Sequence, residues 1–167
     1  MFATASLSAA VPRALSTGWW APLSIGAAAI HFAVIPDHLQ EWWAFGLFFA
    51  ILGWFQVMWP IAYRNRPSPG LAWLAIAVNA ATVVLWAWSR TAGLPLGPGM
   101  PEAIGAADVV ATTFEVALAV GLLLRAASAS GRAEQATSPD PRAAAVTLAY
   151  WAAVAALATA AIGMAGG

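Results

Sequence analysis

The chain has 167 residues, of which 62% are hydrophobic and only 8% are charged, with seven basic residues balancing seven acidic ones. Because soluble domains carry roughly 25% charged residues, this composition excludes a soluble globular protein, and its apolar content excludes a disordered one. The absence of cysteine excludes disulfides, thiolate metal sites and cysteine nucleophiles, and a neutral chain without lysine has no basic surface for nucleic acid. We therefore expect an all-α integral membrane protein with no nucleic-acid partner.

Long apolar stretches predict a bundle of five transmembrane helices in a single domain that comprises residues 1–167. The expected spans, in chain order, are 19–35, 40–63, 71–89, 104–125 and 143–164. Between the last two spans, the segment 126–142 is a Ser/Ala/Gly/Pro stretch with mixed charge and is expected to form a flexible cytoplasmic loop. The first twelve residues carry no charged side chain and do not have the pattern of a signal peptide, so we expect the N-terminus to be retained.

The arginines orient this bundle. With five spans, six of the seven arginines lie on one side of the membrane and only Arg90 lies on the other. The positive-inside rule therefore predicts a cytoplasmic N-terminus and a C-terminus outside the cell. The chain is also rich in tryptophan, and most of its ten indole rings fall near the expected span ends, where the membrane interface favours them. We expect a multi-pass protein of the cell membrane, specifically the bacterial inner membrane.

Pro36 separates the first two expected spans. Since proline disfavours helix at the preceding residue and suits the first turn of a new one, we expect the chain to reverse here and the second span to begin near Pro36. His38 and Glu41 would then lie three residues apart on one helix face, a spacing with which helical side chains chelate metals, while His31 comes from the preceding span. Gln56 follows His38 by about five helical turns and is expected on the same face, deeper in the membrane.

The fourth span carries a stripe of polar residues. Asp108, Thr112 and Glu115 are spaced so that they share one face of the helix, and Glu115 lies roughly 10 Å deeper than Asp108. An ionised carboxylate facing lipid at this depth costs at least about 2.5 kcal/mol. We therefore expect Glu115 to face the bundle interior, with His31 as its nearest partner in depth.

The third span and the loop after it are expected to complete this polar region. Asn79 and Arg90 share one face of the span, so the amide would support the buried groups and the guanidinium would pair with Asp108 or Glu102. The outer segment 91–101 is dense in glycine and proline, which favours a fixed series of turns over a random linker. Such a loop is suited to cap a site.

Together these residues predict a metal site in the outer half of the bundle. The candidate ligands are His31, His38, Glu41, Asp108 and Glu115. The candidate supporting donors around them are Gln56, Asn79, Thr112 and Arg90. Imidazole and carboxylate ligation without sulfur suits copper, zinc or iron, whereas the surrounding carboxylates make a poor pocket for haem. No nucleophile lies in a pattern with a base, so no catalytic residue is assigned and enzymatic activity is left open.

Three functions are compatible with this pattern. The first is binding of a metal ion, either for metal handling or within a membrane oxidoreductase complex. The second is a non-catalytic accessory subunit of a larger membrane complex, in which the polar cluster is a buried ion-pair network. The third is a pathway for protons or a small substrate. The expected partners are the lipid bilayer and either other membrane subunits or further copies of the chain, while the aromatic wall beside His38 would also suit an apolar ligand.

The middle of the chain carries three motifs of mixed polar and aromatic residues. They read H-x4-P-x-H-x2-E-W-x3-G-x-F-F-x6-Q from His31 to Gln56, W-x-W-S-R-T-x-G-L-P-x-G-P from Trp86 to Pro98, and E-x5-D-x6-E from Glu102 to Glu115. This half of the chain resembles small polytopic membrane proteins of actinobacterial type. No activity is known to us for that group, so the resemblance implies a membrane fold and transfers no function.

Overall fold

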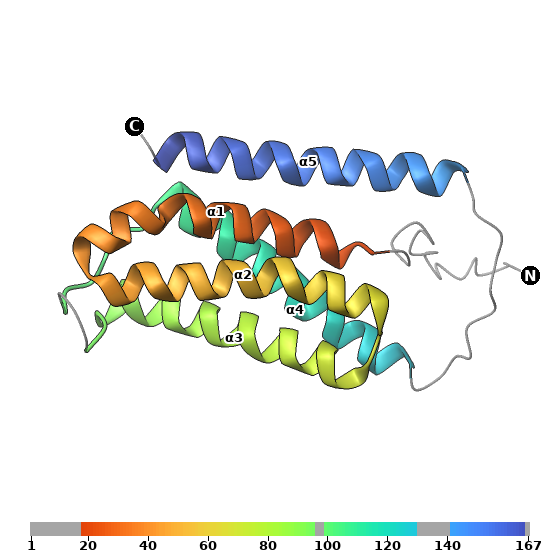
Figure 1. Cartoon of the computed structure of the whole chain (residues 1–167), viewed down its shortest axis with the longest axis horizontal. Coiled ribbons are helices and arrows are strands. Elements are labelled where there is room, and N and C mark those ends of the chain that lie inside the picture. Colours follow the sequence, from red (N-terminus) through yellow and green to blue (C-terminus); the bar gives the residue numbers. More distant parts are fainter. Residues whose placement is uncertain (1–17, 96–98, 130–140, 166–167) are drawn as a thin grey trace, which may run out of the picture.

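The computed structural model describes residues 18–95, 99–129 and 141–165, and these form five α-helices and no strand (Figure 1). The helices are α1 (Trp20–Glu41), α2 (Trp43–Asn65), α3 (Pro69–Thr91), α4 (Ala106–Ala129) and α5 (Pro141–Ala165). The all-α prediction is confirmed. Most of the expected cytoplasmic loop, 126–142, lies outside the described residues.

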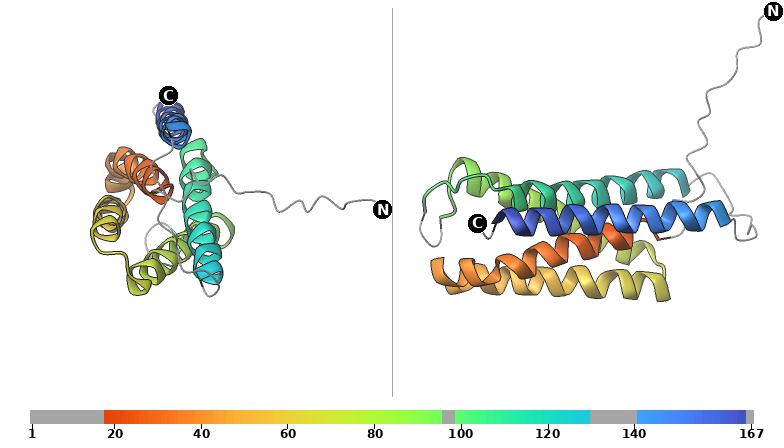
Figure 2. Two further views of the ribbon diagram at one scale, coloured as in Figure 1. Left: turned by 90° about the vertical axis from the view of Figure 1, so that its right-hand side faces the viewer. Right: turned by 90° about the horizontal axis from the view of Figure 1, so that it is seen from above.

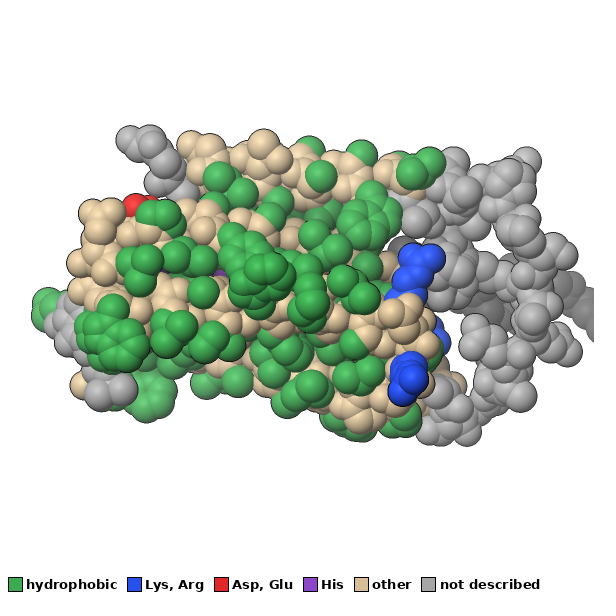
Figure 3. All heavy atoms as spheres, in the orientation of Figure 1, with side chains coloured by type: hydrophobic (Ala, Val, Ile, Leu, Met, Phe, Trp, Pro, Cys, Tyr) green, Lys and Arg blue, Asp and Glu red, His purple; other side chains and the backbone are tan. Residues whose placement is uncertain are grey.

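Three of the helices are long and apolar enough to cross a membrane. They are α2, α3 and the Ala106–Ser128 part of α4, while α5 contains a shorter apolar stretch, Leu148–Met164. Apolar side chains are spread over the face of the bundle that Figure 3 shows, and Trp54, Val84 and Leu124 are each about 60% exposed. Since apolar surface costs about 25 cal/mol per Å² in water, this exterior suits lipid and not an aqueous solvent.

The helices differ in how closely they pack. α1 packs against α2, α4 and α5, and α3 packs mainly against α4, whereas α2 and α3 make few contacts with each other. Seen end-on, α5 lies at one edge of the bundle beside α1 and α4 (Figure 2). Among the helix pairs that contact each other, α2 and α3 are therefore the most loosely packed.

Two glycines allow α1 to approach its neighbours closely. A Cβ atom added at Gly26 would lie 2.8 Å from side-chain atoms of Phe114 on α4 and Val154 on α5. A Cβ atom added at Gly53 on α2 would lie 2.7 Å from the ring of Phe32 on α1. Because small residues let helix backbones come together, these two contacts set the spacing of α1 with α2 and α4.

An aromatic cluster fills the bundle interior at one end. The ring of Trp20 makes edge contacts with Trp59 and Tyr63, with centroids 5.6 and 5.3 Å apart. The indole Nε1 of Trp59 donates a 2.8 Å hydrogen bond to the carbonyl of Leu71, which joins α2 to the start of α3. The cluster closes this end of the interior with large apolar rings.

Pro36 does not end the first helix, which corrects the expectation from sequence. α1 continues through Pro36 to Glu41, and the chain reverses at Trp42, whose backbone is extended with φ of −164° and ψ of 128°. The N–H of Trp42 donates to the carbonyl of His38 over 2.9 Å. Proline removes one helical hydrogen bond, but the extensive packing of α1 on α2 outweighs that loss here.

This correction changes the placement of two candidate ligands. His38 and Glu41 belong to the last turns of α1 and not to the beginning of α2. The prediction that Gln56 shares a helix face with His38 was therefore wrong, since the two residues are on different helices.

Candidate functional site

A cavity of about 450 Å³ lies between α2 and α3 and is also lined by α1 and α4. Phe45, Phe48 and Phe49 of α2 line one side, and Trp86 of α3 lines another. Polar side chains from α1, α3 and α4 line its two ends. The cavity is thus an apolar chamber bounded by polar groups, in the region where α2 and α3 make few contacts.

A fully buried polar group lies at the deep end of the cavity, and we call it the deep triad: His31, Gln56 and Glu115. His31 and Glu115 line the cavity, and Gln56 is not among its lining residues. These three side chains come from α1, α2 and α4, and each residue is at most 4% exposed. His31 Nδ1 lies 2.8 Å from Gln56 Oε1, and Gln56 Nε2 donates to Glu115 Oε1 over 3.0 Å. His31 Nε2 is 3.7 Å from Glu115 Oε1. Glu115 thus faces the bundle interior and lies next to His31. The sequence had predicted this pairing from the similar depth of the two residues.

Hydrogen bonding selects the same tautomer for both histidines. An amide oxygen can only accept, so in the neutral ring His31 carries its proton on Nδ1 and donates it to Gln56. His38 Nδ1 likewise donates to the backbone carbonyl of Val34 over 2.8 Å. In both rings Nε2 keeps the free lone pair. Histidines that bind metals have this arrangement, with the other nitrogen bonded to an oxygen acceptor.

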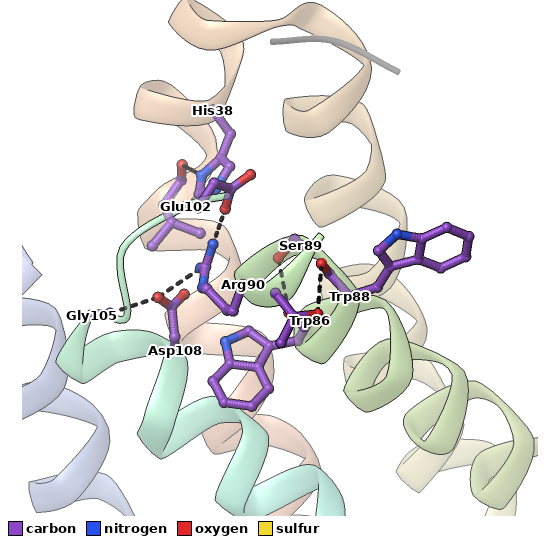
Figure 4. A network of polar contacts seen from close by, with 10 residues as sticks. His38, Trp86, Trp88, Ser89, Arg90, Glu102, Gly105 and Asp108 are labelled. Atoms are coloured by element: carbon purple, nitrogen blue, oxygen red, sulfur yellow. Dashed lines mark hydrogen bonds and ion pairs between the residues drawn. The ribbon is translucent and has the colours of Figure 1, made fainter. Parts of the chain in front are cut away.

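The outer end of the cavity is an ion-paired group that we call the outer cluster: Arg90, Glu102 and Asp108 (Figure 4). The guanidinium of Arg90 donates to Glu102 and, over 2.8 Å, to Asp108 Oδ2. The same Asp108 oxygen accepts from the N–H of Gly105 over 2.9 Å, at the start of α4. Arg90 therefore pairs with both acids that its position on the third span had suggested, and its side chain is only 9% exposed.

The connection between α3 and α4 covers the outer end. The N–H of Glu102 donates to the carbonyl of Ser89 over 3.1 Å, which ties this connection to the end of α3. Gly93 and Gly99 adopt φ of +72° and +71°, a conformation that side chains disfavour, so glycine is needed for these turns. Leu94 lines the cavity from the same segment.

The candidate metal ligands fall into two layers. His31 and His38 are seven residues apart on α1, and so are Asp108 and Glu115 on α4, so each pair is separated in depth by about 10 Å. The ring of Phe49 lies next to both histidines, with centroid distances of 5.4 and 4.3 Å. Within residues 18–95, 99–129 and 141–165, no group of three or more His, Asp or Glu side chains converges to hold a metal ion. The structure thus does not support a metal centre assembled from all the candidate ligands.

The other candidate ligands and supporting donors do not lie together at one end of the cavity. Glu41 lines a second cavity, of about 290 Å³, together with Glu102. Thr112 lines the main cavity between the two layers. Asn79 is buried and donates to the carbonyl of Ala75 over 2.8 Å, while its Oδ1 has no hydrogen-bond partner. Asn79 is not among the residues that line the cavity.

The structure adds one residue to those that the metal hypothesis selected. Nε1 of Trp86 and Nε of Arg90 are both buried without a hydrogen-bond partner, and both side chains line the cavity. Trp86 and Arg90 are four residues apart on α3 and so lie on one face of the helix, which the sequence alone predicts. That both nitrogens lack an acceptor follows only from the packing around them.

The combined arrangement is suited to holding a small molecule. Ligand sites are typically cavities of roughly 300–1,000 Å³ with mainly apolar walls and a few well-placed polar groups. Comparison of the chain with protein-family models, curated proteins and solved structures finds no match.

Proposed function

We propose that the chain is an integral membrane protein that binds a small amphipathic molecule in the cavity between α2 and α3. The observation that carries this proposal is the 450 Å³ cavity itself, in which the aromatic wall formed by Phe45, Phe48 and Phe49 stands between polar groups at both ends. Apolar walls would hold the body of the molecule, and the outer cluster or the deep triad would orient its polar group.

The proposal includes five membrane spans, with the N-terminus in the cytoplasm and the C-terminus outside the bacterial inner membrane. α1 has 22 residues, which is about 33 Å at 1.5 Å per residue and long enough to cross a bilayer. Arg64 and Arg66 lie at the end of α2, and arginines gather at that end of the bundle (Figure 3). Arg90 lies at the opposite end of α3, with the cavity. This asymmetry supports a cytoplasmic position for the end with more arginines.

The proposal is tested by native mass spectrometry of the protein purified from membranes in mild detergent. Thr82 lines the cavity, so Thr82→Trp is expected to fill part of it and to displace a bound molecule. Val84, two residues away on α3, is 63% exposed on the outside, which makes Val84→Trp the matched control. We expect a bound mass of a few hundred daltons in the wild type and in Val84→Trp, and its loss in Thr82→Trp. A wild type without any bound mass, or equal retention in the two variants, would contradict the proposal.

A metal ion is a second candidate ligand of the same cavity. His31, His38, Asp108 and Glu115, four of the five candidate ligands, line it, and both histidines hold Nε2 free. An ion of copper, zinc or iron would bind first at the deep end, where His31 Nε2 and Glu115 Oε1 are 3.7 Å apart. Such a site would serve metal handling or a membrane oxidoreductase complex.

Elemental analysis after incubation with each of these ions tests whether the cavity binds a metal ion. If it does, we expect one bound ion per chain in the wild type and loss of that ion in Glu115→Ala. His38→Ala, in the other layer, is the control that should keep the ion if the deep triad binds it. A wild type that remains free of metal with every ion would exclude this candidate.

The other two functions stay predictions. An accessory subunit should copurify with stoichiometric partner chains in mild detergent, whereas a protein that acts alone should not. A proton or substrate pathway would have to pass the aromatic cluster of Trp20, Trp59 and Tyr63, which follows the deep triad toward the other end of the bundle.

A further inference from the structure

We infer that the cavity selects a neutral, flat molecule with a carbonyl oxygen at its polar end, which is the chemistry of a quinone ring. This inference rests on the proposed function and specifies the class of ligand. Three features carry it: two buried donors without acceptors, the charge balance of the outer cluster, and the aromatic walls.

The two unpartnered donors require an acceptor. Most buried polar atoms in proteins have a hydrogen-bond partner, so a buried N–H without one, on a side chain that lines a cavity, points to an acceptor in the ligand. Trp86 Nε1 and Arg90 Nε are two such buried atoms, and each belongs to a side chain that lines the cavity. Figure 4 shows the indole of Trp86 below Arg90 and Asp108, with its nitrogen on the side toward them. A carbonyl oxygen has two lone pairs and can accept from both donors.

The outer cluster disfavours charged ligands. Both terminal nitrogens of Arg90 are already engaged, one by Glu102 and the other by Asp108. One positive charge therefore faces two negative charges, and the excess of negative charge would repel a carboxylate or phosphate group. A cation offers no acceptor to Trp86 Nε1 or Arg90 Nε. A neutral acceptor is the chemistry that remains.

The walls favour a flat ring. Phe45, Phe48 and Phe49 of α2 line one side of the cavity, and the indole of Trp86 comes from α3 on another. Aromatic walls pack well against a planar ring, either stacked or edge-on. Because α2 and α3 make few contacts with each other, an apolar molecule could enter between them from the bilayer.

The test compares probes that share a ring system and differ in polar groups. The detergent-purified full-length protein is titrated with menadione, a neutral naphthoquinone, with 2-methylnaphthalene, which has the same rings without oxygen, and with 1-naphthoate, an anion. Binding is measured by equilibrium dialysis. We expect menadione to bind about tenfold more tightly than 2-methylnaphthalene, as one to two hydrogen bonds to buried donors would give, and naphthoate to bind more weakly than menadione.

Two substitutions in α3 test whether Trp86 causes the preference for menadione over 2-methylnaphthalene. Trp86→Phe keeps an aromatic ring but removes the N–H, and is expected to bring menadione affinity to within about threefold of that of 2-methylnaphthalene. Trp73→Phe removes an indole N–H from a residue that is 55% exposed and outside the cavity lining, and should leave the preference intact.

The outcomes distinguish this inference from the proposed function. If menadione and 2-methylnaphthalene bind wild type equally and Thr82→Trp abolishes both, the cavity binds small molecules but the acceptor inference is wrong. Preferential binding of naphthoate would also overturn it. If none of the three probes binds the wild type, the inference fails, while the bound mass seen by native mass spectrometry decides the proposed function separately. The wild-type comparison decides the matter even if Trp86→Phe does not fold.

Discussion

Oε1 of Glu115 lies 3.7 Å from Nε2 of His31, and the amide of Gln56 bonds to both side chains, donating to the acid and accepting from the imidazole. The three residues come from α4, α1 and α2, so one amide links three helices in the middle of an apolar bundle. Ser24 Oγ of α1 adds a 2.7 Å hydrogen bond to the backbone carbonyl of Gln56. Gln56 is therefore the residue on which the deep triad depends.

Replacement of Gln56 by leucine should destabilise the bundle. The substitution keeps a similar volume but leaves His31 Nδ1–H and Glu115 without the amide, and a buried polar group without a partner costs about 1–3 kcal/mol. The free energy of unfolding is measured by titration with SDS in mixed micelles. Met58→Leu, on an exposed residue of the same helix, is the control. An unfolding midpoint for Gln56→Leu equal to that of the control would show that the deep triad adds no stability.

Enlarging Gly26 should push three helices apart. A Cβ atom there would lie 2.8 Å from both Phe114 and Val154, so Gly26→Ala is expected to cost about 1–3 kcal/mol in the free energy of unfolding. At Gly163 a Cβ atom meets nothing within 4 Å, and Gly163→Ala should be neutral or slightly stabilising because alanine favours helix. SDS titration of the two variants side by side measures the difference. Equal stability would mean that α1 does not depend on this close approach.

Loss of Arg90 should release the connection that covers the cavity. Arg90→Gln removes the cation that holds Glu102 and Asp108, so the segment 99–105 should open more often. Hydrogen exchange measures this opening, and the amide of Glu102, bonded to Ser89, should exchange several-fold faster. Arg125→Gln alters an exposed arginine of α4 away from the cavity and serves as control. Unchanged exchange in 99–105 would show that the ion pairs do not hold this segment.

The proposed orientation can be tested with single cysteines, because the natural chain has none. Met100 is 73% exposed between α3 and α4, on the side assigned to the outside. Met100→Cys should react with a membrane-impermeant maleimide on intact cells, whereas Arg66→Cys, just after α2, should react only after the membrane is permeabilised. The reverse labelling pattern would invert the orientation.

Some contacts of the site could be predicted from the sequence, because the position of a residue along its helix sets its depth in the membrane. A rise of 1.5 Å per residue places Glu115 below the membrane surface and near the level of His31, and the structure brings the two together. Arg90 is the one arginine near Glu102 and Asp108 in the expected topology, and it pairs with both. Pro36 misled the prediction, because a local rule for proline was overridden by the packing of α1 on α2.

The sequence alone determined that the chain is helical and apolar, where its long apolar segments lie and on which side its arginines gather. These properties follow from residue types along the chain and need no knowledge of neighbouring helices. Only the tertiary structure decided that Gln56 links His31 to Glu115, that a cavity lies between α2 and α3, and that Trp86 Nε1 has no partner there. The rotation of each helix about its axis, and the neighbours that each side chain meets, depend on the packing of all the helices at once.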